Sequence, residues 1–574
     1  MWNTENLTDM GIAGVYSALR NWGPAGSGWT GTYGFDSWGM TGMYRYSNGN
    51  MTNGAITVTS GLFKDTWKKL YEGVHRANDA IVNIPIKSPV SAEKKGRLVA
   101  EAKFLRAFFY FRLNELWRGV PYYDTPIDSE EATKGQETEA FIWGKVIDDL
   151  NDCIAEPNFP DRYTNSADAS QGRATKGAAY ALRGKAYMMI GEYGKAVLDF
   201  DKVGQCGYNL YQGGYKSLFT EANEYCEEMI FSVQNIAEVN YGSRSQWYCG
   251  TRSAHSTVGT NSWGEYQVSP DLVDLYENAD GTAFNWDDVI PGYSTMEAKQ
   301  REVFFLRDTL KADGTPIHPR ITTEVSKRLA NFTAATKALY LPNGNEARIK
   351  KAYEGRDPRL AQSVITPYSE FIGYDGGTSE ATLVSRWPIF GNSVHYNANP
   401  AGQNDLAVDA STYLFYFHRK FVFEGYGVVS REACPINEPL IRYADVLLMW
   451  AEALLEQDDL PGAAAKVNLV RDRVGVKMPA VKYSDKDDLR NKIRNERRIE
   501  FLNEGINFFD EMRWRTLKDT KYKGGVNEAQ QPWGATAQVG AFRWPEENNL
   551  YVWPIPQEEV QKNKNLVPTP GWKY

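Results

Sequence analysis

Several features that define a function by sequence alone are missing from this chain of 574 residues. It has five cysteines, an odd number, so at least one thiol is unpaired within the chain and no disulfide framework is predicted. Cys-x-x-Cys and HExxH motifs are absent and the five histidines lie far apart, so we expect no metal site. No apolar run of about 18 residues occurs, which argues against a transmembrane helix.

Nucleotide and nucleic-acid binding are also disfavoured. The 64 Lys and Arg are scattered among 72 Asp and Glu, which leaves no basic face for a nucleic acid. P-loop and GxSxG motifs are absent. A formal G-x-G-x-x-G at Gly26, Gly28 and Gly31 follows no apolar strand, and Trp29 would crowd a pyrophosphate. We therefore expect no cofactor and assign no catalytic residue.

Helical periodicity is the strongest signal that is present. One apolar stripe at spacings of three and four comprises Phe63, Trp67, Leu70, Val74, Ala77 and Ile81, and a second comprises Leu98, Ala102, Leu105, Phe109, Leu113 and Leu116. Ser91 is the expected N-cap of the second helix. The segment 138–155 is predicted to be another helix of the same kind.

Two stretches match the layout of a tetratricopeptide repeat. Residues 177–204 place Gly184 and Ala196 twelve residues apart, and residues 442–476 do the same with Ala451 and Ala463. The repeat needs such small residues where two antiparallel helices cross closely. We therefore predict a mainly α fold built on tetratricopeptide-like helical hairpins.

The chain is expected to form a single domain over residues 1–574 with two kinds of structure. The helical scaffold covers about 57–204 and 439–520, and a loop-rich part covers about 20–56 and 205–438. In the loop-rich part the helical period fades while Gly, Asn, Tyr and Trp become frequent, so we predict long loops and short strands inserted into the scaffold.

The loop-rich part carries the candidate binding residues. Large aromatic residues that belong to no apolar helical stripe occur in two stretches. These are "GWTGTYGFDSWGMTGMYRY", residues 28–46, and residues 241–266. Indole and phenol faces stack on sugar C–H faces, while hydroxyls seek carboxylate, amide and guanidinium partners. We predict a carbohydrate site composed of Trp29, Tyr33, Asp36, Trp38, Trp247, Tyr248, Arg252, Asn261 and Trp263, with Trp387 and Tyr396 in reserve.

Two alternatives stay open at this point. The same surface could hold a peptide or a protein neighbour instead of a sugar. A glycoside hydrolase needs only two suitably separated carboxylates, and 72 acidic residues provide many pairs. Most of these acids lie beside lysines and arginines in a surface pattern, which disfavours the hydrolase.

Four stretches resemble the SusD/RagB family of cell-surface nutrient-binding proteins of Bacteroidota. They are "EAKFLRAFFYFRLNELWRGVPYY" (101–123), "ATKGAAYALRGKAYMMIGEYGKAV" (174–197), the block from "EPLIRYADVLLMWAEALLE" to "RNERRIEFLNEGINFFDEMRWRT", and "YVWPIPQEEVQKNKNLVPTPGW" (551–572). The resemblance runs from Trp2 to Trp572. One departure is Asn507, where the family usually has arginine; we expect it to alter a local ion pair without touching the loop site.

The resemblance implies a non-enzymatic lipoprotein on the outer leaflet of the outer membrane. It would capture oligosaccharides and deliver them to a SusC-like TonB-dependent transporter. Its membrane attachment would be an N-terminal lipidated cysteine, which is missing from this chain together with the signal peptide. A peptide-binding lid of the RagB type is the alternative within the same family.

Overall fold

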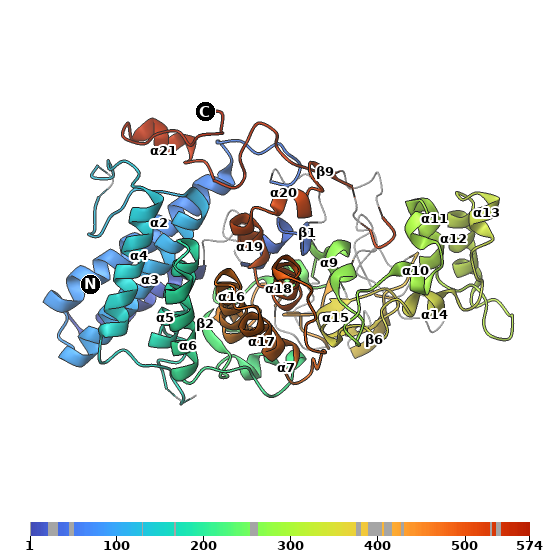
Figure 1. Cartoon of the computed structure of the whole chain (residues 1–574), viewed down its shortest axis with the longest axis horizontal. Coiled ribbons are helices and arrows are strands. Elements are labelled where there is room, and N and C mark those ends of the chain that lie inside the picture. Colours follow the sequence, from blue (N-terminus) through green and yellow to red (C-terminus); the bar gives the residue numbers. More distant parts are fainter. Residues whose placement is uncertain are drawn as a thin grey trace.

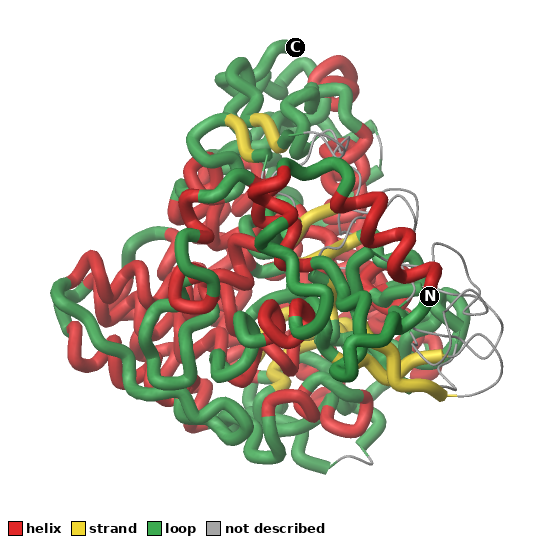
Figure 2. The backbone as a smooth tube through the Cα atoms, turned by 90° about the vertical axis from the view of Figure 1, so that its right-hand side faces the viewer, coloured by secondary structure: helices red, strands yellow, loops and turns green. Residues whose placement is uncertain are grey.

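The structure of the protein is a computed structural model. It describes residues 2–20, 32–44, 51–128, 130–165, 168–252, 262–374, 380–388, 405–406, 416–425, 430–528, 531–534 and 541–574. Helices dominate the fold and the strands are few and short (Figure 2). No helix in these ranges combines the length and the apolar character needed to cross a bilayer.

The scaffold consists of two groups of paired helices (Figure 1). The N-terminal group contains α1 (Glu5–Ser17), α2 (Gly61–Lys87), α3 (Ala92–Trp117), α4 (Glu139–Ala155), α5 (Lys176–Met189) and α6 (Tyr193–Gln205). The C-terminal group contains α16 (Tyr443–Glu456), α17 (Leu460–Arg471), α18 (Lys486–Glu500) and α19 (Asn507–Trp514). Helix α6 packs against α16, so the two groups form one continuous scaffold.

Local sequence signals explain these helices. Ser91 caps α3 as expected, because its hydroxyl accepts the Lys94 N–H at 3.2 Å. In the first predicted repeat, a Cβ added to Gly184 would lie 2.5 Å from a ring carbon of Phe200, so only glycine permits this approach of α5 and α6. Ala451 and Ala463 are fully buried in the second repeat. The predicted helical-hairpin fold is therefore confirmed.

Between α6 and α16 the chain forms small sheets and short helices. The sheets are antiparallel pairs, among them β2 (Met229–Val233) with β8 (Glu438–Arg442), β4 (Val364–Ile365) with β7 (Phe417–His418) and β5 (Glu370–Tyr374) with β6 (Glu380–Val384). A further pair, β9 (Val526–Asn527) with β10 (Phe542–Arg543), lies beyond the scaffold. Strand β8 runs directly into α16, so the β2–β8 pair fixes this part of the chain to the scaffold.

The helices of this part are more numerous than the sequence analysis predicted. They are α7 (Tyr215–Leu218), α8 (Ser245–Cys249), α9 (Pro270–Leu275), α10 (Trp286–Val289), α11 (Ala298–Phe305), α12 (Pro319–Leu329), α13 (Ala334–Lys337), α14 (Asn345–Lys350) and α15 (Pro358–Ser363). Helices α10 to α14 form a lobe on the right of Figure 1, with its own apolar core around Phe305, Ile321 and Ile349. The remaining short elements are η1 (Ala18–Arg20), η2 (Thr32–Ser37), η3 (Glu221–Asn223), η4 (Tyr293–Thr295), α20 (Leu517–Thr520) and α21 (Gln557–Lys562).

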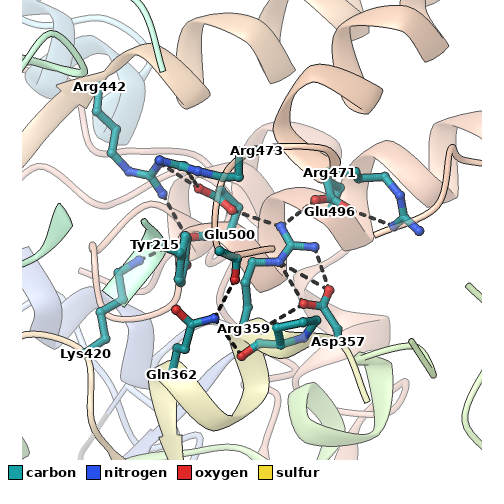
Figure 3. Close-up of polar contacts among 12 residues, drawn as sticks. Tyr215, Asp357, Arg359, Gln362, Lys420, Arg442, Arg471, Arg473, Glu496 and Glu500 are labelled. Atoms are coloured by element: carbon teal, nitrogen blue, oxygen red, sulfur yellow. Dashed lines mark hydrogen bonds and ion pairs between the residues drawn. The ribbon is translucent and has the colours of Figure 1, made fainter. Parts of the chain in front are cut away.

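A buried ion network joins this inserted part to the scaffold (Figure 3). It contains Arg359, Lys420, Arg442, Arg471, Arg473, Glu228, Asp357, Glu496, Glu500 and Glu504. Glu500, at the end of α18, accepts hydrogen bonds from Arg442 at 2.8 Å and from Arg359 and Arg473 at 2.9 Å each. Burial raises the pKa of Glu500, but the surrounding guanidinium groups lower it to about 2, so the carboxylate stays ionised.

Replacing Glu500 tests how strongly this network supports the fold. Glu500→Gln removes the negative charge that three buried arginines share, and uncompensated buried charge is costly. We expect the free energy of unfolding to fall by about 3–5 kcal/mol, measured by urea denaturation. Glu547→Gln is the control, because Glu547 pairs with Lys573 on the open surface and should have no measurable effect. Equal midpoints for the two variants would contradict this role of the network.

Candidate functional site

Strand pairing brings the two predicted ring-bearing stretches together. Strand β1 (Gly42–Tyr44) pairs antiparallel with β3 (Tyr266–Val268), which places Tyr44 opposite Tyr266. Met43 and Val268 are buried and anchor the pair. A Cβ added to Gly42 would lie 2.7 Å from the carbonyl oxygen of Asp36, so this turn requires glycine. The described parts of the two stretches, residues 32–44 and 262–266, therefore meet at one place in the fold.

Five aromatic residues form a continuous ring cluster around this strand pair. Helix α8 supplies Trp247 and Tyr248, whose ring centroids are 5.6 Å apart in a stacked arrangement. Trp263 contacts Trp247 edge to face at 4.7 Å between ring centroids, and the backbone N–H of Trp263 donates to the Trp247 carbonyl oxygen at 2.7 Å. Tyr266 lies 5.7 Å from Tyr248 and 5.5 Å from Tyr44. The ring cluster is thus Tyr44, Trp247, Tyr248, Trp263 and Tyr266.

The ring cluster has a buried layer and a half-buried layer. Trp247 and Tyr248 are only 5% and 6% exposed and pack on an apolar core that includes Phe371, Leu383 and Phe417. The other three rings of the cluster are half-buried and so keep part of their surface open. The buried pair contacts Trp263 and Tyr266 directly, and Tyr44 packs on Tyr266, so the half-buried rings are restrained by their neighbours.

Guanidinium groups border the ring cluster. Arg431 lies over Trp247 at 4.2 Å and near Trp263 at 5.2 Å from the ring centroid, and Arg244 lies over Trp247 at 5.6 Å. Burial lowers the pKa of Arg431 against the opposing charge of Glu432, and the positive charge of Arg252 adds to the lowering. Arg252 therefore lies within electrostatic reach of the same ring cluster. Aromatic faces with adjacent N–H donors can bind a ligand that has both C–H faces and oxygen acceptors.

The predicted site residues fall into three groups. Trp247, Tyr248, Trp263 and Arg252 belong to the ring cluster and its border. Trp29 and Asn261 lie outside the described residues; Tyr33 contributes its backbone to η2, and its side chain is outside the description. Asp36 and Trp38 form the third group.

Asp36 and Trp38 point toward the helical core. Trp38 packs edge to face on Phe508 at 5.6 Å and on Trp553 at 6.2 Å. Asp36 is 2% exposed and accepts the Gly505 N–H at 3.1 Å. Asp36 therefore holds the segment before β1 against the turn between α18 and α19, and Trp38 packs that segment on α19 itself.

The departure at Asn507 has a different effect from the one expected. Its side-chain oxygen accepts the Thr41 N–H at 3.3 Å, and it lies against Gly39, where a Cβ would approach it to 2.3 Å. Our expectation that this position does not touch the loop site is wrong, because Asn507 positions the segment that leads into β1. Its short side chain permits that approach, which a longer side chain at this position would obstruct.

The reserve candidates do not join the ring cluster. Trp387 is 5% exposed in the core of the α10–α14 lobe, where its indole N–H donates to Glu302 at 3.1 Å. Tyr396 lies outside the described residues.

Sequence analysis missed four residues of this site, namely Tyr44, Arg244, Tyr266 and Arg431. Tyr44 and Tyr266 lay within or beside the quoted stretches, and the signal that could have selected them is their place in two short runs that pair as strands. Arg431 stands far from both runs in sequence, and no local pattern marks it.

Comparison with known proteins identifies the family of this chain. A family model described as "SusD family" matches residues 227–572, and one described as "Starch-binding associating with outer membrane" matches residues 4–188. The chain therefore belongs to the SusD family.

Individual relatives are distant but cover nearly the whole chain. SusD-like protein P25 of Formosa agariphila is 24% identical over 525 residues, covering 89% of this chain and 79% of that protein. A SusD-like carbohydrate binding protein from Bacteroides fragilis has a TM-score of 0.73 at 23% identity and 99% coverage of both chains. Surface glycan-binding protein A from Bacteroides thetaiotaomicron, solved with laminarihexaose, has a TM-score of 0.60 at 17% identity, with 99% of each chain covered.

The buried carboxyl group of Asp36 predicts a pH-dependent stability. Burial raises the pKa of Asp36 to about 7, and the negative charge of Glu504 adds to this increase. The hydrogen bond from the Gly505 N–H acts in the opposite direction but does not outweigh burial. An unfolded aspartate titrates near pH 3.9, so the folded state binds more protons between about pH 4 and pH 7, and stability falls as pH rises through this window. Asp36→Asn lacks this pH-dependent contribution. As pH rises from about 4 to about 7, the free energy of unfolding of the variant should therefore increase relative to that of the wild type by on the order of 1–3 kcal/mol.

The measurement is chemical denaturation of both proteins from about pH 4 to pH 8. The exposed Asp148→Asn substitution, on α4, is the control and should keep a constant offset from the wild type. If Asp36→Asn also keeps a constant offset, Asp36 is not buried with a raised pKa.

Proposed function

We propose that this protein captures oligosaccharides at the cell surface and delivers them to a SusC-like TonB-dependent transporter. The observation that carries the proposal is the ring cluster. In it, three half-buried aromatic residues are joined by ring contacts to a buried aromatic pair, and guanidinium groups lie beside them. Such a surface suits a sugar, because the C–H face of the sugar ring stacks on an aromatic face while the sugar hydroxyl oxygens accept hydrogen bonds from N–H donors.

The ligand contacts in this proposal come from Tyr44, Trp263 and Tyr266, with Arg252 and Arg431 as polar partners. Trp247 and Tyr248 support Trp263 and Tyr266 directly and Tyr44 through Tyr266. Trp29, Tyr33 and Asn261 stay part of the proposal, because they neighbour β1 and β3 in the chain. Asp36 and Trp38 act on the site through the segment that leads into β1.

Two comparisons support the sugar as ligand. One family model that matches the chain is described as starch-binding and associating with the outer membrane, and one structural neighbour was solved with laminarihexaose. The proposal also includes attachment as a lipoprotein at the outer leaflet of the outer membrane and the absence of catalytic activity. Laminarin and its oligosaccharides are therefore the first glycans to test.

Removing one half-buried ring tests the site directly. The first step is to identify the class of ligand by isothermal titration of the protein with laminarin, starch, fructan, mannan, xylan and pectin. A peptide library is titrated in parallel. Trp263→Ala should then weaken binding at least tenfold, because a central stacking ring contributes about 2 kcal/mol or more. Phe141→Ala is the control, since Phe141 is an exposed aromatic residue on α4, away from the ring cluster, and its loss should leave affinity unchanged.

Other outcomes of this titration overturn the proposal. Saturable binding of peptides and of no glycan would assign the protein to the peptide-binding class. Release of reducing ends from a bound glycan would make it a hydrolase. Unchanged affinity in a folded Trp263→Ala variant would place the glycan away from the ring cluster.

A further inference from the structure

A cavity lined by helices of the scaffold shares no residue with the ring cluster. It measures about 340 Å³ and is bordered by α16, α18, α19, the turn between α5 and α6, and the end of α3. Four arginines line it, namely Arg118, Arg490, Arg494 and Arg513, together with two carboxylates, Glu452 and Glu456. The pairing of these charges decides what the cavity can bind.

Both carboxylates of the cavity are already engaged. Glu452 accepts two hydrogen bonds of 2.6 Å from Arg513 and a third from the Trp514 indole N–H at 3.1 Å. Glu456 pairs with Arg490 at 3.3 Å. Arg118 pairs with Glu139 at 2.7 Å, yet its Nε–H is buried and meets no acceptor among the described residues.

Among the described residues, Arg494 is the arginine of this cavity that has no carboxylate partner. Across the part of the chain that the structure describes, it makes no hydrogen bond or ion pair, and its Nε is buried. Its guanidinium instead stacks on Trp514 at 5.1 Å from the ring centroid. The same indole also receives Arg513 at 4.8 Å and Arg498 at 5.5 Å, and both of these have carboxylate partners.

The surroundings of Arg494 disfavour its ionised form. Burial lowers the pKa of Arg494 against the opposing charge of Glu452. Repulsion from Arg513, Arg498 and Arg490 adds to the lowering. A bound anion would offset both effects, because it would supply the counter-charge that Arg494 lacks among the described residues.

We propose that this cavity is a second binding site, specific for an oxyanion group that pairs with Arg494. Sulfate, phosphate and carboxylate oxygens match the planar fork of a guanidinium group. The volume exceeds that of one ion, since about ten waters of roughly 30 Å³ would fill it. Met188, Met189 and Leu455 supply an apolar wall, so the oxyanion can be free or carried on a small molecule such as an acidic monosaccharide.

Calorimetric titration of the full chain tests this site. The probes are sodium sulfate, sodium phosphate, glucuronate and galactose 6-sulfate, each at ionic strength matched with sodium chloride, with neutral glucose as the blank. At least one anion should bind saturably and should bind at least tenfold more weakly to Arg494→Gln. Saturation by sulfate or phosphate identifies a free oxyanion, whereas saturation by the acidic sugars alone identifies a sugar-borne group.

The variants separate pairing from general charge and from misfolding. Arg494→Gln breaks no ion pair of the described residues, so its melting temperature should match that of the wild type. Arg515→Gln removes the same charge from an exposed residue nearby that does not line the cavity, and it should bind the anion normally. Arg494→Lys keeps a positive charge but loses the planar fork of the guanidinium group, so its affinity for the anion should lie between those of Arg494→Gln and Arg515→Gln.

Two results would refute the site. One is that no probe binds more tightly than chloride, and the other is that Arg494→Gln and Arg515→Gln weaken binding equally. Neither result bears on the ring cluster, because the binding of neutral glycans there does not involve Arg494.

Discussion

The carboxylate of Glu500 accepts hydrogen bonds from three guanidinium groups that arrive from separate parts of the chain. Arg359 comes from the inserted part, Arg442 from the end of β8, and Arg473 from just beyond α17. None of these side chains is exposed, so each charge is tolerated only while its partners are in place. This requirement fixes how the inserted part sits on the helical scaffold.

The same corner of the fold also holds the ring cluster. Beyond α18 the chain turns through Asn503 and Gly505, both with positive φ, and the Asn503 side chain contacts the sulfur of Cys249 in α8 at 3.4 Å. Gly505 binds Asp36 and Asn507 binds Thr41, both in the segment that leads into β1. The rings therefore lie on short elements whose backbones are tied to a rigid interior. Preorganisation of this kind reduces the ordering cost that a loop-borne site would otherwise incur on binding.

Sequence reasoning predicted the scaffold because its signals are local. The stripe that begins at Phe63 and the spacing of Gly184 and Ala196 depend on neighbours within a few turns. Trp38 had no such signal, since its partners Phe508 and Trp553 lie at the other end of the sequence. The short helices α10 and α13 span four residues each, which is too few to establish a helical period. The boundaries between scaffold and loop-rich part stay a prediction.

The charged residues show the same limit more sharply. "RNERRIE" in α18 reads as a solvated face in sequence, yet the fold buries Glu496, Arg497 and Glu500 and leaves Arg494 facing a cavity. Which arginine keeps a counter-ion depends on carboxylates from other helices, and sequence spacing does not contain that information.

The most direct test of the central claim is a crystal structure of the protein with the glycan that it binds. Our account predicts a sugar ring stacked on Trp263 or Tyr266, with its hydroxyls within hydrogen-bonding distance of Arg252 or Arg431. A glycan bound at another surface, with the ring cluster unchanged and unoccupied, would contradict it.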